Sequence, residues 1–371
     1  MRGAMRAVAA GLMLVGSAGW AQGKHAPGTY KVGVAQRAFL NGDAAYDWRG
    51  AKIHALLTTI WYPAGPEARE VQQWAGNPAQ PFAMAGRAAP GAAMAKGPAK
   101  FPLILLSHGT GGTAAMMAWL GTRLAAHGFI AAAVNHPGNN ALEPYTVQGF
   151  TLGWERAVDL SQVLNGMLAD REFGPRIDAS RVGAAGMSFG GYTVLEAAGG
   201  IGDMSALMRE CEAGKTPRAG CQPPPEFPGL VKEATELYRT DAAYRKAMDA
   251  GGEPHVDGRI RAVFAMAPFA AVFSAESLEK IRIPVEIVVG AGDPILAPKN
   301  NAEYAAAHIP GAKLTVYPGG VGHYTFVDSC TALGKKEMPQ LCVDAAGVNR
   351  HAIHEEAGKA AIKFFDRALG K

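Results

Sequence analysis

A serine flanked by glycines is the first feature of this sequence that could do chemistry. The run GMSFGG at residues 186–191 matches the pattern G-x-S-x-G around Ser188. In that pattern the serine sits at a sharp turn between a strand and a helix, with its hydroxyl pointing into open space. Side chains two residues before or after the serine would crowd this turn, which explains Gly186 and Gly190. A nucleophilic serine needs a base and an acid that orients the base.

An aspartate and a histidine follow Ser188 in the order that such a serine requires. The strand-like run at 283–289 ends in a turn that carries Asp293, and His323 follows the next strand. Both positions fall at the carboxyl edge of a parallel sheet, where open α/β sheets build their sites. We therefore predict that His323 moves the proton of Ser188 and that Asp293 orients the imidazole. Each residue alone could instead be an ordinary turn or loop residue.

A glycine-rich turn, SHGTGG at residues 107–112, is the predicted site for stabilising negative charge. It follows a buried strand, and its backbone can approach a substrate closely. We expect the backbone N–H groups of Thr110 and Phe189 to form an oxyanion hole. The candidates for the substrate pocket are His108, His136, Met187 and Tyr324, although shaping the oxyanion turn is the preferred role for His108 and a turn role is at least as well supported for His136.

Strands and helices alternate along the chain, which predicts an α/β fold with a mostly parallel central sheet flanked by helices. The stretch 63–100, rich in Pro, Gly and Ala, is expected to be loop with short helical pieces at most. The strands are expected at 30–36, 56–62, 103–106, 129–134, 181–185, 260–266, 285–289 and 313–317. The helices are expected at 113–127, 154–170, 189–198, 301–308 and 352–369.

The rhythm of strands and helices breaks between residues 199 and 258. This insertion holds two cysteines, the run PPPEFP and one polar helical run at 230–248. A cap or lid over the site is the preferred interpretation, with surface decoration as the alternative. We treat residues 22–371 as a single hydrolase domain that includes this insertion.

Composition and cysteine content indicate an exported globular protein. The 371 residues are 49% apolar and 18% charged, with a net charge of only +4, which makes nucleic acid an unexpected partner. Residues 1–21 resemble a cleaved signal peptide, with a membrane anchor as the alternative. Export to the periplasm or medium favours disulfides, and neighbour pairing of Cys211 with Cys221 and of Cys330 with Cys342 is preferred over other connectivities. No cofactor or metal is expected, because the spacings typical of zinc, dinucleotide and P-loop sites are absent.

The chain resembles bacterial α/β-hydrolases similar to dienelactone hydrolases and platelet-activating-factor acetylhydrolases. The resemblance runs from WYPA at 61–64, through SHGTGG, NHPGNN at 135–140 and GMSFGG, to GAGDP at 290–294, and ends near His323. It implies the α/β-hydrolase fold and a carboxylic ester hydrolase that works through an acyl-enzyme on Ser188, with Asp293 and His323 as partners. Short or medium acyl esters, or polymeric esters, are the implied substrates.

Three departures from the family pattern limit that implication. Dienelactone hydrolases use a cysteine where this chain has Ser188. Eukaryotic acetylhydrolases place their acid after the preceding strand, where residues 265–269 carry no carboxylate. Met187 replaces a histidine that many relatives carry, which predicts a more apolar pocket. An acyltransferase or a peptidase on the same triad remains open, as does a catalytically silent binding protein. Oligomeric state cannot be inferred from the residues.

Overall fold

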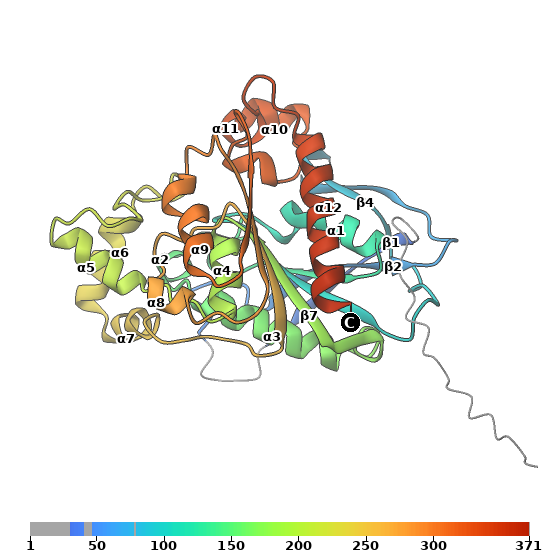
Figure 1. The fold of residues 1–371 in the computed structure, drawn as a ribbon, viewed down its shortest axis with the longest axis horizontal. Coiled ribbons are helices and arrows are strands. Elements are labelled where there is room, and N and C mark those ends of the chain that lie inside the picture. Colours follow the sequence, from blue (N-terminus) through green and yellow to red (C-terminus); the bar gives the residue numbers. More distant parts are fainter. Residues whose placement is uncertain (1–29, 41–46, 78, 371) are drawn as a thin grey trace, which may run out of the picture.

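Ten strands form a single sheet in the computed structural model, which describes residues 30–40, 47–77 and 79–370 (Figure 1). Their order across the sheet is β10-β9-β8-β7-β5-β6-β2-β1-β4-β3. The strands are β1 (Lys31–Phe39), β2 (Leu56–Ala64), β3 (Val71–Asn77), β4 (Gln80–Pro90), β5 (Phe101–Ser107), β6 (Ile130–Val134), β7 (Ile177–Met187), β8 (Ile260–Met266), β9 (Val285–Gly290) and β10 (Lys313–Tyr317).

Strands β5 to β10 run parallel to one another. Strand β2 pairs antiparallel with β6 and with β1. Every residue of β5 and β6 is buried, as expected for parallel strands covered on both faces. The prediction of a mostly parallel sheet flanked by helices is therefore confirmed.

Helices cover both faces of the sheet. Gly183 and Gly186 of β7 face opposite sides because side chains alternate along a strand. A Cβ on Gly183 would lie 2.7 Å from Phe365 in α12, whereas one on Gly186 would lie 2.1 Å from the carbonyl oxygen of Gly190 in α4. Helix α1 packs with α12, and α3 packs with α4. These helices are α1 (Ala118–Ala126), α3 (Glu155–Ala169), α4 (Phe189–Ala197) and α12 (Arg350–Leu369).

The expected loop at residues 63–100 is wrong, because β3 and β4 form a hairpin there. Strand β4 also pairs with β1, which attaches the hairpin to the main sheet. Alanine, glycine and proline have low strand propensity, so the local composition gave no strand signal. Pairing with distant strands and burial of small side chains such as Ala83 and Ala88 override that preference here.

Residues 199–258 form three helices, which extend from one end of the sheet (Figure 1). They are α5 (Met204–Glu212), α6 (Leu230–Thr240) and α7 (Ala242–Ala250). The single helical run expected at 230–248 is divided at Asp241, whose carboxylate accepts hydrogen bonds from the N–H groups of Ala243 and Tyr244 and so begins α7. Tyr244 and Met248 pack with Leu152 in a small core separate from the main one.

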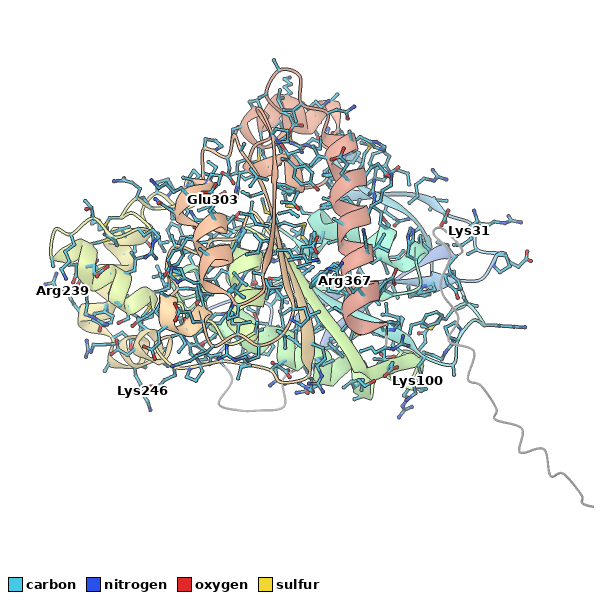
Figure 2. The ribbon with its side chains drawn as sticks, viewed as in Figure 1. Lys31, Lys100, Arg239, Lys246, Glu303 and Arg367 are labelled. Atoms are coloured by element: carbon cyan, nitrogen blue, oxygen red, sulfur yellow. A yellow bond between two sulfur atoms is a disulfide. The ribbon has the colours of Figure 1, made fainter. Side chains whose placement is uncertain are left out.

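Both disulfides have the neighbour pairing that the sequence favoured, Cys211 with Cys221 and Cys330 with Cys342. Charged side chains such as Arg239, Lys246 and Glu303 project from the periphery (Figure 2). No helix in the described part of the chain is long and apolar enough to cross a bilayer. The expected signal peptide at 1–21 lies outside the described residues.

Candidate active site

Ser188 occupies a strained turn between β7 and α4, as the glycine pattern predicted. Its backbone has φ of 58° and ψ of −118°, a region that costs a non-glycine residue about 1–3 kcal/mol. Hydrogen bonds from the Ser188 N–H to Met266 at 2.9 Å and from the Phe269 N–H to the Ser188 carbonyl at 3.0 Å hold the turn against the end of β8. A Cβ on Gly190 would lie 1.9 Å from the carbonyl oxygen of Ser107, so only glycine fits there.

Ser188, His323 and Asp293 form one chain of hydrogen bonds. Nε2 of His323 lies 2.8 Å from Oγ of Ser188, and Nδ1 lies 2.7 Å from Oδ2 of Asp293. A carboxylate can only accept, so Nδ1 carries the proton and Nε2 accepts from the serine hydroxyl. This is the arrangement that a nucleophilic serine requires.

The turns that carry the acid and the base are held against each other at the carboxyl edge of the sheet. Oδ1 of Asp293 accepts hydrogen bonds from the N–H groups of Ile295 at 2.9 Å and Leu296 at 2.8 Å, which fix the carboxylate. The N–H of Gly292 bonds to the carbonyl of Val321, two residues before His323. Loop geometry therefore presets the distance between Asp293 and His323 before a substrate binds.

The turn at residues 107–112 lies directly beside Ser188. A Cβ on Gly109 would be 3.2 Å from Cβ of Ser188, and Gly111 has φ of +62°, a conformation that favours glycine. Within the described chain, the N–H groups of Thr110 and Phe189 donate no hydrogen bond to another protein group. Both residues also line the pocket that contains Ser188, so the two donors predicted for an oxyanion hole are close to the reacting centre.

A second Ser-His-Asp set lies beneath this turn and was not foreseen from the sequence. Ser107 Oγ is 2.8 Å from Nε2 of His136, whose Nδ1 is 2.7 Å from Asp159 Oδ2. Ser107 has no exposed surface, whereas Ser188 is 9% exposed and lines the pocket. Burial, followed by the nearby Arg156 guanidinium, lowers the pKa of His136 to about 3. The second set therefore lacks both substrate access and an effective base, and we assign it a structural role.

Arg156 connects the parts that surround the nucleophile. Its guanidinium donates to the carbonyl of His108, to Oγ1 of Thr193 at 2.9 Å and to Oδ1 of Asn139 at 3.3 Å, and it lies over the ring of Phe189. Asn139 Oδ1 in turn accepts the N–H of Gly111 at 2.8 Å. Arg156 is almost fully buried, as arginine is only when it is paired, but this burial cannot be recognised from the sequence of the helix at 155–169.

The pocket assignments for His108 and His136 are corrected by the structure. Both imidazoles are fully buried and neither lines the pocket. Nδ1 of His108 donates to the carbonyl of Gly109 at 2.7 Å, and its Nε2 accepts the N–H of His136 at 3.2 Å. The two histidines support the turn from behind, because their polar atoms are all engaged by the protein.

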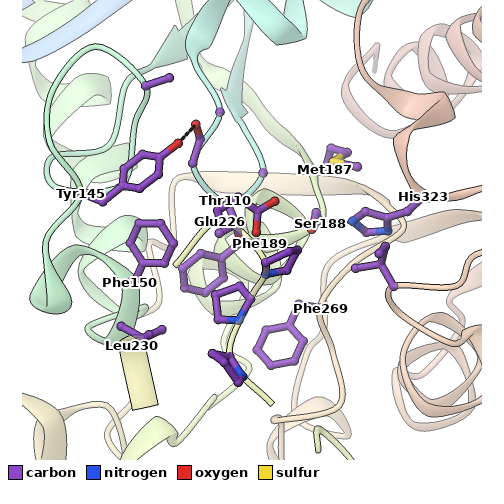
Figure 3. A pocket seen from close by; sticks show the side chains of 18 of the residues that line it. Thr110, Tyr145, Phe150, Met187, Ser188, Phe189, Glu226, Leu230, Phe269 and His323 are labelled. Atoms are coloured by element: carbon purple, nitrogen blue, oxygen red, sulfur yellow. Dashed lines mark hydrogen bonds between the residues drawn. The ribbon is translucent and has the colours of Figure 1, made fainter. Parts of the chain in front are cut away.

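Met187 and Tyr324 do line the pocket, which has a volume of about 1230 Å³ and opens above Ser188 and His323 (Figure 3). Its walls are largely apolar and rich in methionine, a side chain that adapts to irregular ligands. Methionines in the lining include Met116, Met187, Met204, Met208, Met248 and Met338.

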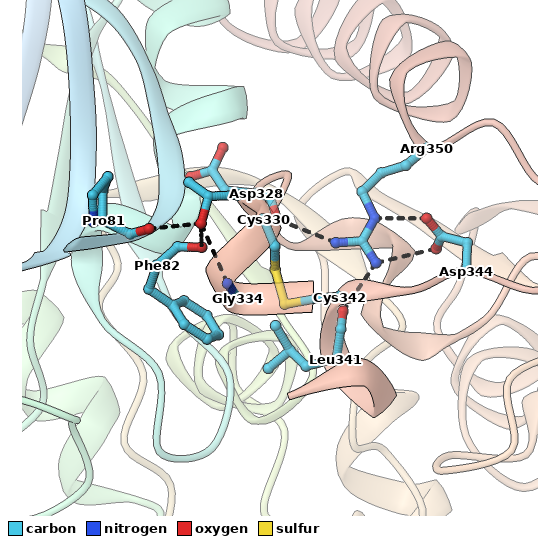
Figure 4. The surroundings of a disulfide bond; sticks show 10 residues. Pro81, Phe82, Asp328, Cys330, Gly334, Leu341, Cys342, Asp344 and Arg350 are labelled. Carbon is cyan, nitrogen blue, oxygen red and sulfur yellow. Dashed lines mark hydrogen bonds and ion pairs between the residues drawn. A yellow bond between two sulfur atoms is a disulfide. The ribbon is translucent and has the colours of Figure 1, made fainter. Parts of the chain in front are cut away.

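Three segments outside the α/β core build the pocket walls. Residues 204–235 of the insertion, including Cys211 and Cys221, form one wall, and the β3–β4 hairpin contributes Trp74 and Phe82. The third wall is the segment closed by the Cys330–Cys342 disulfide (Figure 4).

The segment closed by this disulfide is attached to the hairpin and to the core. Thr331 donates to the carbonyl of Pro81 at 2.6 Å, and Arg350 of α12 bonds to Asp344 and to the carbonyl of Leu341 (Figure 4). The hairpin was missing from the sequence prediction, so this part of the pocket could not have been anticipated.

The fold is that of the α/β-hydrolases. A ferulic acid esterase from Streptomyces cinnamoneus superimposes with a TM-score of 0.63 at 22% identity, covering 94% of this chain and 93% of that one. At this identity the likeness establishes the fold alone.

Sequence similarity is confined to part of the chain and agrees with the resemblance to acetylhydrolases. The family described as platelet-activating factor acetylhydrolase, isoform II, matches residues 80–156. The platelet-activating factor acetylhydrolase of Cavia porcellus is 29% identical over 26% of this chain and 31% of its own. Cutinase est1 of Thermobifida alba is 36% identical over 28% of this chain and 33% of its own length. The cutinase of Thermobifida fusca is 33% identical over 28% of this chain and 32% of its own length. The chain thus spans about a third of the length of the curated relatives it matches.

Proposed function

We propose that this protein is a serine carboxylic ester hydrolase that works through an acyl-enzyme on Ser188. The observation that carries the proposal is the continuous hydrogen-bond chain from Asp293 through His323 to Ser188 at the floor of an accessible apolar pocket. The similarity to proteins named as cutinases and acetylhydrolases supports the same reaction class.

The reaction begins when Oγ of Ser188 attacks the ester carbonyl and its proton passes to Nε2 of His323. The resulting oxyanion accepts hydrogen bonds from the N–H groups of Thr110 and Phe189, and Asp293 stabilises the imidazolium. The tetrahedral intermediate collapses as His323 returns the proton to the departing alcohol. Water, activated by the same imidazole, then releases the acid and regenerates the serine.

Short or medium acyl esters and polymeric esters are the proposed substrates, because the pocket is large, apolar and open. We also propose that residues 199–258 act as a cap, since this segment forms one wall of the pocket. Export after cleavage following Ala21 is proposed from the signal-like N-terminus and supported by the two disulfides. N-terminal sequencing of the secreted protein would test the cleavage position.

The proposed activity is tested with p-nitrophenyl butyrate and a fluorophosphonate probe. The purified protein should hydrolyse the ester, and Ser188→Ala should reduce kcat by several orders of magnitude while the protein stays folded. Peptide mapping should find the probe on Ser188 and not on Ser107, the serine of the buried second set. A folded sample that neither turns over the ester nor reacts with the probe would contradict the proposal.

A further inference from the structure

One carboxylate stands out in the lining of the otherwise apolar pocket. Glu226 comes from the PPPEFP run of the insertion and is half-buried. Figure 3 shows it projecting into the pocket between Tyr145 and Ser188. The active-site mechanism does not use this residue, so its charge requires a separate explanation.

One hydrogen bond and one close approach place Glu226 between the two turns that flank Ser188. Its Oε1 lies 3.3 Å from the hydroxyl of Tyr324, the residue after His323. On the other side, its Cγ would lie 3.5 Å from a Cβ on Gly111, the residue after Thr110. Glu226 therefore spans the distance between the loop that carries the base and the turn that carries the oxyanion donor.

Glu226 has no basic side chain beside it in the described pocket lining. Among the described residues that line the pocket, no lysine or arginine is present, and the other carboxylate is the exposed Glu212. When a substrate fills the apolar pocket, a carboxylate with no cationic partner in the pocket walls acts over several ångströms, because little water is left to screen it. A substrate that carries its own charge near the scissile bond must therefore enter this field.

We propose that Glu226 is a specificity-determining residue that makes the site discriminate against esters bearing a free carboxylate and favour neutral or cationic esters. The proposal rests on the ester hydrolase function proposed above and narrows its substrate class. A diester of a dicarboxylic acid would be cleaved once, and the anionic half-ester would be a poor second substrate. The same field repels the carboxylate product, which promotes its release.

Three ethyl esters with a six-carbon acyl chain test this discrimination by charge. Their kcat/KM values are measured by pH-stat titration at low ionic strength. They are ethyl hexanoate, which is neutral, monoethyl adipate, which is anionic, and ethyl 6-(trimethylammonio)hexanoate, which is cationic. In Glu226→Gln we expect kcat/KM for the anionic ester to rise roughly tenfold relative to the neutral ester, and the cationic to neutral ratio to fall by a similar factor. Added salt should reduce the discrimination by the wild-type protein.

Two further variants separate the charge of Glu226 from its contact with Tyr324. Tyr324→Phe removes the hydrogen bond but keeps the carboxylate, so the ranking of the three esters should persist. Glu212→Gln removes the exposed charge and should change the ratios less than Glu226→Gln does. Unchanged kcat/KM ratios in Glu226→Gln, or an equal change of these ratios in Tyr324→Phe, would overturn the proposal. Failure of the wild type to cleave even ethyl hexanoate and p-nitrophenyl butyrate would instead count against the proposed hydrolase function.

Discussion

Asp293→Asn is the substitution whose consequence can be worked out most fully from the geometry. The carboxylate has two fixed tasks, since Oδ1 accepts two N–H groups at 2.9 and 2.8 Å while Oδ2 accepts the proton of His323 Nδ1. An asparagine that keeps its oxygen toward the two N–H groups must present an amide donor to Nδ1. The imidazole then carries its proton on Nε2, where it cannot accept the proton of Ser188.

The flipped asparagine would restore the correct tautomer but would set its NH₂ group against two N–H donors. Losing two buried hydrogen bonds costs about 1–3 kcal/mol each, or roughly 2–6 kcal/mol together. The competent state is then populated at about 10⁻² to 10⁻⁴ of the total. We therefore expect kcat for p-nitrophenyl butyrate to fall about 10²- to 10⁴-fold.

The melting temperature of Asp293→Asn should change little, because the inactive orientation keeps the two backbone hydrogen bonds. Asp178→Asn is the matched control, since Asp178 lies at the opposite end of β7 from Ser188 and bonds to Ser180 and Arg181. It should retain wild-type kcat. If folded Asp293→Asn kept kcat within tenfold of the wild type, the role given to Asp293 would be refuted.

Three further perturbations have defined outcomes. Burial lowers the pKa of both His136 and His354 to about 3, while both would bind a proton near pH 6.5 in the unfolded chain, so the stability that each histidine contributes falls as pH drops below 6.5. Burial also raises the pKa of Glu155 and Glu196 to about 8, which has the opposite effect on stability over this range. At about 1.4 kcal/mol per pH unit, His354→Gln should remove about 1 kcal/mol of the histidine-linked destabilisation between pH 7 and pH 5.5, measured by denaturant titration beside the wild type, and an equal pH dependence of the two proteins would contradict this assignment. Arg156→Met should lower kcat about 10²- to 10³-fold with little change in KM, as for loss of an oxyanion donor, whereas a rise in KM alone would argue against a positioning role. Replacing Cys330 and Cys342 together by serine should destabilise the segment 330–342 by about 3 kcal/mol of loop-closure free energy and make it sensitive to limited proteolysis. An unaltered proteolytic pattern would show that the other contacts of this segment are enough to keep it folded.

The meeting of Ser188, Asp293 and His323 could be predicted from sequence because it depends on local rules. A strand-to-helix serine turn needs Gly186 and Gly190, and parallel strands bring the residues after their carboxyl ends to one edge. Ser188, Asp293 and His323 were therefore expected to meet, and the structure brings them within hydrogen-bond distance. The core strands were equally predictable, because buried parallel strands appear as continuous apolar runs.

The parts that sequence reasoning missed depend on contacts between distant segments. The β3–β4 hairpin is stabilised because β4 pairs with β1, and the alanine-rich sequence of β4 does not predict this contact. His108 and His136 were placed in the pocket because they flank a turn, but the buried side chains of Asp159 and Arg156 determine where they lie. Nothing in the PPPEFP run revealed that Glu226 would reach both active-site loops.

Two of the three walls of the pocket, the insertion and the segment around residues 330–342, lie outside the sheet, and each disulfide closes a short loop within one of these two walls. The sheet that positions Ser188, Asp293 and His323 is therefore separate from the segments that would contact most of a bound ligand. These two walls could therefore be exchanged for other segments while the hairpin stays paired with β1, provided that the contacts of Arg350 with Asp344 and Leu341 are kept. Chimaeras that transplant residues 199–258 or 328–344 offer a direct way to redirect this protein toward new esters.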